Sequence, residues 1–212
     1  MAADSSSATI ASMKQAKSIL RQQLKQKLKA LLKDDKDLQS AIIQRKILAS
    51  EVYKSSQRVS IFLPMNDEVN TIPILKSMLD SGKQCFIPHY QGPNMIMVRL
   101  ESWEAFEKLP SNSWGIKQPD EFNINHDAIF SGGLDLMFMP GLGFTKGGAR
   151  LGRGKGYYDK YLKKCDEAGK MPHTVALLFN EQLVEDIPTL EHDMLVDSLI
   201  YPTQQELDNI TD

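Results

Sequence analysis

A glycine-rich stretch between residues 147 and 159 carries the residue types best suited to binding phosphate. It reads GGARLGRGKGYYD and follows PGLGF, with Arg150, Arg153 and Lys155 between its glycines. Glycines allow the backbone to approach a ligand and to turn consecutive N–H groups toward it, while the cations add full positive charge. The stretch therefore predicts a polyanion site. The open alternative is a glycine-rich surface loop whose charges are incidental.

Two well-known phosphate-binding motifs do not fit this stretch. A Walker loop has glycine, four residues and then Gly-Lys-Ser/Thr, whereas Gly154 and Lys155 are followed by a further glycine, and Ala149 occupies the position of the first glycine. The dinucleotide fingerprint fails as well, because GLGFTKG places Lys146 where the third glycine belongs. The sequence thus indicates anion binding by backbone N–H groups, a helix N-terminus and local cations.

The residues that follow the glycines open a predicted helix. Tyr157 and Tyr158 are either core residues of that helix or, at its first turn, a platform on which a flat ligand ring stacks. Asp159 has a structural explanation, because a carboxylate in the first turn interacts favourably with the helix dipole. Beside a bound polyphosphate the same carboxylate is well placed to hold magnesium, which prefers oxygen ligands and substrate phosphates.

Apolar runs and helical periodicity predict the elements around this stretch. Short apolar runs bounded by turn residues or charges predict buried strands at residues 58–65, 84–90, 135–140, 174–179 and 196–202, with 95–100 as a further candidate. Helices are predicted as a pair within residues 12–54, over residues 71–82, and after the glycines as far as Gly169. One irregular region, about residues 110–133, is left.

The alternation of strands and helices predicts the fold class and the place of the site. We expect an α/β protein, a three-layer α-β-α sandwich with a mostly parallel central sheet, Rossmann-like, preceded by two N-terminal helices. In such sheets ligands collect at the carboxyl ends of the strands. The glycine stretch follows the strand DLMFMP and precedes a helix, so we expect it at that edge.

Length, composition and charge limit the class of protein. The 212 residues, 42% hydrophobic and 25% charged with a formal net charge of −2, are typical of a globular protein and argue against nucleic acid as the main partner. We expect one domain over residues 13–203, a disordered extension over 1–12 and a C-terminal tail over 204–212. Cys85 and Cys165 are expected to be buried and reduced. Since no signal peptide or membrane-spanning run is seen, we expect a cytoplasmic protein, a monomer by default, without a membrane partner.

One segment near the N-terminus is strongly basic. Residues 13–33 contain seven Lys and Arg side chains and no acid. A solvated helix face is the first interpretation of this pattern, and a contribution to the anion site is the alternative. A targeting helix is the third interpretation.

Four motifs, in one order, are similar to those of a known family. AKSILR lies in the basic helix, PGLGF and RLGRGKGYYD lie around the glycines, and HDMLVD lies near the C-terminus. Over about residues 14–202 the chain resembles the 5-formyltetrahydrofolate cyclo-ligases, also called 5,10-methenyltetrahydrofolate synthetases. The resemblance implies an enzyme of folate one-carbon metabolism that uses ATP and Mg²⁺ to close 5-formyltetrahydrofolate into 5,10-methenyltetrahydrofolate, releasing ADP and phosphate. It also implies transfer of the γ-phosphoryl group to the formyl oxygen, attack by the nitrogen at position 10 and departure of phosphate.

Positions that match the family's motifs carry its implied roles. The implied ATP-binding residues are Lys17, Arg21, Arg150, Leu151, Gly152, Arg153, Gly154, Lys155, Gly156, Tyr157 and Tyr158. The implied folate-binding residues are Leu63, Glu68, Tyr90, Trp114, Arg153, Gly154, Lys155, Gly156 and Tyr157. Arg153 and Lys155 are the implied catalytic cations, and Asp159 and Asp193 are the implied magnesium ligands. Ligation by oxygen alone is expected, because no second histidine lies at ligand spacing from His192.

Two other functions stay open at this point. A sugar-phosphate isomerase or an acyl-CoA transferase can share a three-layer fold, because a fold does not fix chemistry. A nucleic-acid-binding module that uses the basic helix is the second, although the chain lacks a basic and aromatic platform. The segment QGPNMI, between Tyr90 and Met97, carries no basic residue, which leaves open whether a folate's polyglutamate tail is recognised.

Overall fold

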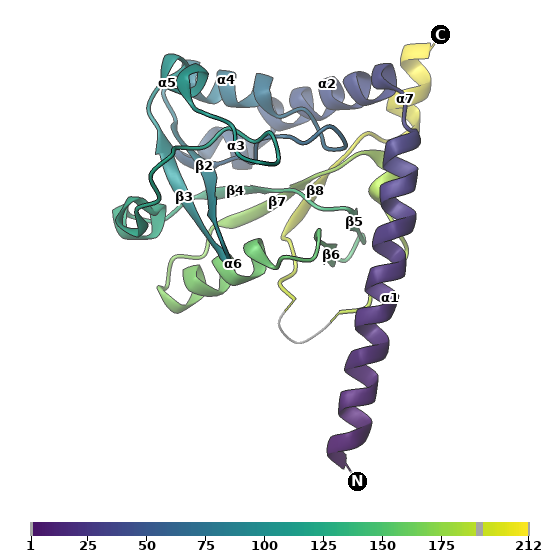
Figure 1. Ribbon diagram of the computed structural model, residues 1–212. Helices are drawn as coiled ribbons and strands as arrows, with labels where there is room; N and C mark the ends of the chain where they lie inside the picture. The colour runs from purple at the N-terminus through teal and green to yellow at the C-terminus, as the bar shows by residue number, and fades with distance from the viewer. Residues whose placement is uncertain (1, 190–192, 212) are drawn as a thin grey trace.

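A six-stranded sheet forms the centre of the protein, in a computed structural model that describes residues 2–189 and 193–211. The sheet has the strand order β3-β2-β1-β4-β7-β8 (Figure 1). Its strands are β1 (Arg58–Ser60), β2 (Gln84–Gln91), β3 (Asn94–Leu100), β4 (Leu136–Met139), β7 (His173–Leu177) and β8 (Ser198–Ile200). Every neighbouring pair is parallel except β2 and β3, which form a hairpin at one edge. The expected mostly parallel sheet is therefore confirmed.

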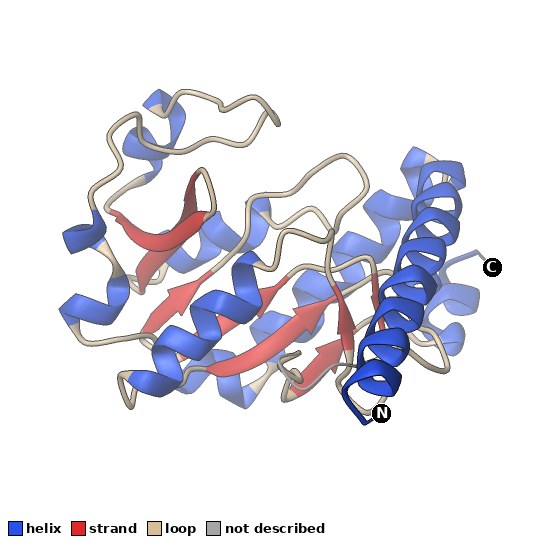
Figure 2. Cartoon of the chain, turned by 60° about the horizontal axis from the view of Figure 1, so that its bottom comes forward, coloured by secondary structure: helices blue, strands red, loops and turns tan. Residues whose placement is uncertain are grey.

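Helices cover both faces of this sheet (Figures 1 and 2). One face carries α2 (Lys33–Ala49), the short α3 (Glu51–Ser55), α4 (Ile72–Asp80) and α5 (Trp103–Lys108), and the other carries α6 (Tyr157–Glu167). α1 (Ala2–Ala30) runs past the end of the sheet near β5 and β6, and α7 (Gln204–Thr211) lies close to the C-terminus. Short 3-10 helices occupy Ile124–His126, Ala128–Ser131 and Asn180–Gln182. The expected three-layer sandwich is confirmed.

The side chains of β4 explain how the central strand holds the two helical layers together. Leu136 and Phe138 pack in the core beneath α2 and α4, whereas Met137 and Met139 pack in the core beneath α6. All four are buried, because side chains alternate between the faces of a strand and both faces are covered. A strand in this position therefore requires a continuous apolar sequence, with no alternating polar residues.

The glycine stretch leaves the sheet and folds into a small hairpin of its own. β5 (Gly143–Phe144) pairs antiparallel with β6 (Arg150–Leu151). Leu24 of α1 packs directly on Gly143, where an added Cβ would lie only 2.6 Å from a Leu24 methyl carbon. A side chain at this position would require Leu24 to move, and the contact brings the basic N-terminal helix against the hairpin.

Several expected boundaries are wrong. The extension over residues 1–12 was expected to be disordered, but α1 already begins at Ala2, since this segment contains no glycine or proline to stop a helix. Residues 12–54 hold parts of three helices instead of two. The strand expected over 58–65 spans only Arg58–Ser60, and Phe62 and Leu63, which follow it, line the cavity described below.

The C-terminal tail also contains structure that the sequence reading did not resolve. Thr203 and Glu206 form a capping box: the backbone N–H of Thr203 donates to Glu206 Oε2 at 2.8 Å, and the N–H of Glu206 donates to Thr203 Oγ1 at 3.3 Å. Lys46 of α2 forms an ion pair with Glu206 at 2.7 Å. The first residues of α7 are therefore fastened to α2.

Two further expectations can be compared with the structure. Cys85 and Cys165 are both buried and unbonded, as expected, and burial raises the pKa of each thiol to about 12. Thiols with such a raised pKa are poor nucleophiles. In the described part of the chain, none of the helices combines the length and the apolar character needed to cross a bilayer.

Candidate active site

A cavity of about 630 Å³ lies where the carboxyl ends of the central strands meet. Phe62 and Leu63, which follow β1, form part of its wall, and so do Pro140 and Gly141, which follow β4. The chain runs from β1 to β2 on one side of β1 and returns to β4 on its other side. This reversal is the switch point at which open parallel sheets bind ligands.

The cavity brings together every residue that the sequence singled out for a site. They come from α1 (Lys17, Arg21), the β1–α4 loop (Leu63, Glu68), the end of β2 and the irregular region (Tyr90, Trp114), the glycine stretch (Arg150, Leu151, Gly152, Arg153, Gly154, Lys155, Gly156), the start of α6 (Tyr157, Tyr158, Asp159) and the segment before β8 (Asp193). His192 lies outside the described residues.

Close packing joins the glycine hairpin to the segment that carries Asp193. The N–H of Val196 donates to the carbonyl oxygen of Gly148 at 2.9 Å. Gly148 has a φ of +87°, and a Cβ added to it would lie 2.4 Å from the carbonyl oxygen of Val196. Only glycine fits a left-handed residue in such close contact.

Gly148→Ala is expected to destabilise the protein by about 2 kcal/mol or more, because a left-handed alanine costs about 1–2 kcal/mol and the clash adds to this. For a chain of this length, that loss lowers the melting temperature by about 4–8 °C, which calorimetry measures. Gly147→Ala is the matched control: a φ in the left-handed region is absent at Gly147, and the nearest neighbouring atom, Thr145 Oγ1, would lie 3.8 Å from its Cβ. Equal melting temperatures for the two variants would contradict the expectation.

The glycines after β6 shape a loop that leads into the N-terminus of α6. Gly154 has a φ of +103° and Gly156, the N-cap residue, a φ of +67°. Arg21 of α1 donates from Nε to the carbonyl oxygen of Gly152 at 2.9 Å, which fixes the loop against the basic helix. A helix N-terminus preceded by such a loop offers backbone N–H groups and a positive dipole end to an anion.

The cavity is strongly cationic. Its lining includes Lys14, Lys17, Arg21, Arg150, Arg153, Lys155, Lys160 and Lys163, against the carboxylates Glu68, Asp159 and Asp193. Eight cations facing three carboxylates favour a ligand with several negative charges, because the field of a cleft concentrates anions. The cations that the sequence analysis assigned to a local anion site therefore line one cavity, in a chain whose net charge is −2.

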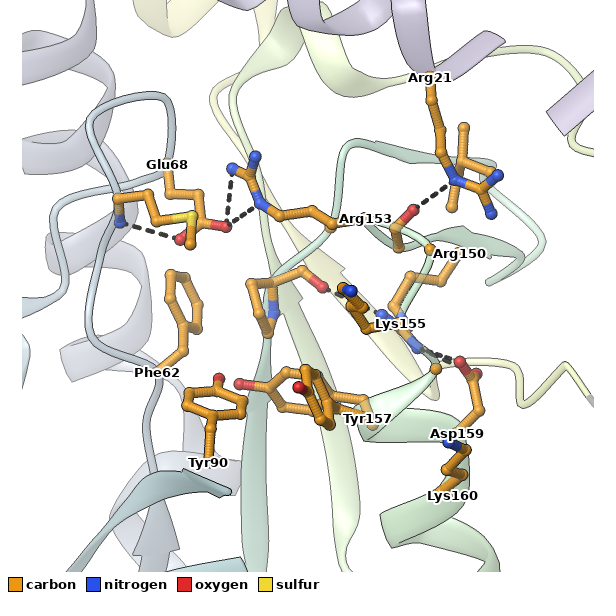
Figure 3. A pocket seen from close by; sticks show the side chains of 18 of the residues that line it. Arg21, Phe62, Glu68, Tyr90, Arg150, Arg153, Lys155, Tyr157, Asp159 and Lys160 are labelled. Carbon is orange, nitrogen blue, oxygen red and sulfur yellow. Dashed lines mark hydrogen bonds and ion pairs between the residues drawn. The ribbon is translucent and has the colours of Figure 1, made fainter. Parts of the chain in front are cut away.

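Two ion pairs connect these cations to the expected metal ligands. One terminal nitrogen of Arg150 donates to both carboxylate oxygens of Asp159, each at 2.9 Å (Figure 3). Lys17 forms an ion pair with Asp193. The side chains of Arg150 and Lys17 are almost fully buried, at 4% and 7% exposed. Burial and pairing hold both carboxylates at the same cavity wall as the loop.

Arg153 contacts the opposite part of the cavity. Its Nε donates to Glu68 Oε1 at 3.0 Å, and its terminal nitrogens donate to the two oxygens of Asp67 at 2.6 and 3.2 Å. Burial raises the pKa of Glu68, while the guanidinium of Arg153 and the N–H of Met65 act to lower it. Arg153 is thus the cation that favours the ionised form of this buried carboxyl.

Aromatic rings form a wall beside these groups. The ring centroid of Tyr90 lies 5.7 Å from that of Trp114 and 5.0 Å from that of Tyr157. The hydroxyl of Tyr157 donates to the carbonyl oxygen of Gly92 at 2.7 Å. Trp114 is 46% exposed, as a ring at the mouth of a cavity would be. Tyr158 is different, since its ring is buried in the core beneath α6 and the guanidinium of Arg150 lies 5.6 Å from its centroid.

Comparison with known proteins identifies the family. The model of the 5-formyltetrahydrofolate cyclo-ligase family matches residues 13–202. The chain belongs to the 5-formyltetrahydrofolate cyclo-ligase family. The 5-formyltetrahydrofolate cyclo-ligase of Mus musculus is 50% identical over 189 residues, 88% of this chain and 93% of the mouse protein. A probable cyclo-ligase of Caenorhabditis elegans is 34% identical over 199 residues, 91% of this chain and 95% of that protein.

Solved structures agree with this assignment. The NMR structure of a 5,10-methenyltetrahydrofolate synthetase from Aquifex aeolicus superimposes with a TM-score of 0.69 at 27% identity, covering 87% of this chain and 88% of that one. The synthetase from Mycoplasma pneumoniae, at 22% identity and a TM-score of 0.65, shows the same fold. This cyclo-ligase family member thus has both the sequence and the architecture of its family.

Some cavity residues of this family member were not found from its sequence. They are Lys14, Phe62, Met65, Ile116, Pro140, Gly141, Lys160 and Lys163. Lys14 could have been found, because it precedes Lys17 by three residues and therefore lies on the same side of a helix. Phe62 and Met65 gave no signal, because they occur inside an apolar run that was read as a strand. Asp67, beside the cavity, was not predicted, because no local sequence pattern marks it.

Proposed function

We propose that this protein converts 5-formyltetrahydrofolate to 5,10-methenyltetrahydrofolate in a reaction that uses ATP and Mg²⁺ and releases ADP and phosphate. The observation that supports this most is the division of one cavity into two kinds of surface. Glu68 and Tyr90 lie at one end, and Arg21, Arg150 and Asp159 lie at the other (Figure 3). A polyphosphate suits the cationic end and a flat ring system suits the aromatic end, so the two substrates can meet in between.

The proposed chemistry has two steps. The formyl oxygen attacks the γ-phosphorus of ATP, the bond from that phosphorus to the β,γ-bridging oxygen breaks, and ADP leaves. The nitrogen at position 10 then attacks the formyl carbon and loses its proton, and phosphate departs with the former formyl oxygen. Phosphoryl transfer asks the protein mainly for alignment of the reactants and stabilisation of charge.

The residues of the cavity suit these tasks. The loop of Gly152 to Gly156 and the start of α6 offer N–H groups to phosphate, and Arg21 and Lys155 add cations. An ionised Glu68 is an acceptor for the N–H donors of a pterin or for the reacting amine. The ring of Tyr157 lies between the two ends of the cavity, at the first position of α6, where it can stack on the folate.

Magnesium has a suitable pair of carboxylates. Asp159 and Asp193 both line the cavity, and each is paired with a cation that a phosphate could engage in its place. Among the described residues, no group of three or more His, Cys, Asp or Glu side chains could hold a metal ion. One or two carboxylates completed by substrate phosphates and water is the usual environment of magnesium, so these residues fit it. When bound, magnesium would offset phosphate charge.

Asp159→Asn and Asp193→Asn are each expected to raise the magnesium concentration needed for half-maximal rate by about tenfold or more, because a neutral amide is a weaker ligand than a carboxylate. Titration of the rate with MgCl₂ at fixed ATP measures this. Asp186→Asn, outside the cavity lining, is the control. If both variants keep the magnesium dependence of the unmodified protein, the ion has been assigned to the wrong residues.

The decisive test of the function is to mix the purified protein with 5-formyltetrahydrofolate, MgCl₂ and ATP and to follow the near-ultraviolet absorbance of the methenyl product. Absorbance should grow only when all three are present. Growth that does not need ATP would refute the proposal, and so would no growth at all. The cytoplasmic location and the monomeric state stay predictions, and size-exclusion chromatography tests the second.

A further inference from the structure

The two cations of the GRGKG sequence have different surroundings. Arg153 is held by carboxylates of the β1–α4 loop, with contacts of 2.6 and 3.2 Å to Asp67 and 3.0 Å to Glu68. Lys155 has no ion pair or hydrogen bond with the described residues. In Figure 3 the guanidinium of Arg153 points toward Glu68 and away from Arg150 and Asp159. Arg153 therefore belongs to the folate end of the cavity in this structure.

The β1–α4 loop presents its two carboxylates in a fixed arrangement. A turn over residues 65–68 is closed by the N–H of Glu68, which donates to the carbonyl oxygen of Met65 at 3.0 Å. The N–H of Met65 donates back to Glu68 Oε2 at 3.0 Å, so one oxygen of Glu68 faces the turn and the other faces Arg153. Asp67 lies outside the cavity lining, and its carboxylate contacts the terminal nitrogens of Arg153, one of which also contacts Glu68.

A buried carboxylate depends more strongly on a fixed cationic partner than an exposed carboxylate does. The side chain of Glu68 is 8% exposed, whereas that of Asp67 is 27% exposed. Arginine has a long, flexible side chain, and anionic phosphates will occupy the other end of the same cavity. Nε and one terminal nitrogen of Arg153 contact the same oxygen of Glu68, each at 3.0 Å, which leaves the guanidinium free to tilt about that single oxygen. Two further contacts with the carboxylate of Asp67 fix both its position and its plane.

We propose that Asp67 is a positioning residue, which holds the guanidinium of Arg153 on Glu68 so that Glu68 meets the folate as an ionised and oriented acceptor. The inference rests on the proposed function and adds to it a residue that touches neither substrate. The two cations of GRGKG then have separate roles. Arg153 positions Glu68 toward the folate, and Lys155 binds the phosphates of ATP.

Asp67→Asn tests this proposal. It is expected to raise the KM for 5-formyltetrahydrofolate by about tenfold, since hydrogen bonds to charged groups are worth this order of affinity, and to leave the KM for ATP within about twofold. Asp80→Asn is the matched control, because Asp80 is exposed, ends the helix after the same loop and lines no part of the cavity. Asp67→Glu should recover part of the affinity. A folate KM unchanged in Asp67→Asn would overturn the proposal.

The pH dependence of kcat/KM for the folate distinguishes a positioning role of Asp67 from an effect of its charge alone. The charged or titratable groups that act on Glu68 are Arg153 and Asp67, with Tyr90 and Tyr158 nearby. Burial raises the pKa of both phenols, so they stay neutral. The guanidinium of Arg153 lowers the pKa of Glu68, and the charge of Asp67 raises it by a smaller amount.

In Asp67→Asn, a guanidinium that is no longer held should let the pKa of Glu68 rise, so the acidic limb of kcat/KM for the folate should move to higher pH. If Asp67 acts only by its charge, that limb should move to lower pH instead, which would contradict the proposal.

Binding measurements test the role of Asp67 independently of the proposed reaction. Titration calorimetry without ATP measures the affinity of each variant for 5-formyltetrahydrofolate in the absence of turnover. The temperature is kept below the lowest melting temperature of the variants. A failure of the absorbance assay with the unmodified protein refutes the function itself. Equal folate binding by Asp67→Asn and the unmodified protein refutes only the role of Asp67.

Discussion

Lys155→Ala is expected to reduce kcat by about 10²–10³-fold, the usual loss when one preorganised charge that faces a reacting group is removed. Lys155 follows the left-handed Gly154, lines the cavity and is exposed. Within the described chain it has no ionic partner, so its charge is available to a phosphate. The KM for ATP should rise as well, and steady-state kinetics with varied ATP measures both quantities.

The control for this variant is Lys164→Ala. Lys164 lies on α6, is exposed like Lys155 and does not line the cavity, so its replacement should leave kcat and both KM values within about twofold. Melting temperatures of the two variants should agree, since neither lysine holds the fold together. Unchanged ATP affinity and rate in Lys155→Ala would show that the glycine loop is not the phosphate site.

Arg150→Met is expected to lower the free energy of unfolding by about 3 kcal/mol, at the lower end of the range for breaking a buried ion pair. Asp159 loses the nitrogen that contacts both of its oxygens, although 23% of its side chain stays exposed and the dipole of α6 partly offsets its charge. The melting temperature should fall by about 6–12 °C. Denaturant unfolding and calorimetry measure the change.

A double variant distinguishes this explanation from a loss of packing. Arg150→Met combined with Asp159→Asn removes the charges of both partners. The double variant leaves no unpaired charge behind, so its loss of stability should be smaller than the sum of the losses in the two single variants. If the two losses add without coupling, the stability comes from the packing of the Arg150 side chain on Tyr158 and not from the ion pair.

The residues of the glycine stretch could be predicted because their chemistry is local. Gly154 and Gly156 need positive φ values and precede a helix that begins at Tyr157, so the order glycine, cation, helix is visible in the sequence itself. The same holds for β4, whose apolar run is what a strand covered on both faces requires. Boundaries were predicted less well, as in β1, because pairing depends on which neighbour a residue meets.

The partners of the charged residues could not be predicted in this way. Lys17 and Asp193 are separated by 176 positions, and Arg153 and Asp67 by 86, so only the folded sheet brings them into contact. Asp159 was explained from the sequence by the helix dipole, and the structure adds Arg150 as its buried partner.

The sequence by itself determined the α/β class, the strand that carries the glycine loop and the residue types of an anion site, since these follow from periodicity and from backbone conformation. Only the tertiary structure decided that Arg153 lies against Asp67 and Glu68 while Lys155 stays open to a ligand. The physical reason is that electrostatic contacts depend on distance in space, so two cations of one motif, separated by a single glycine, can have different partners in the same cavity.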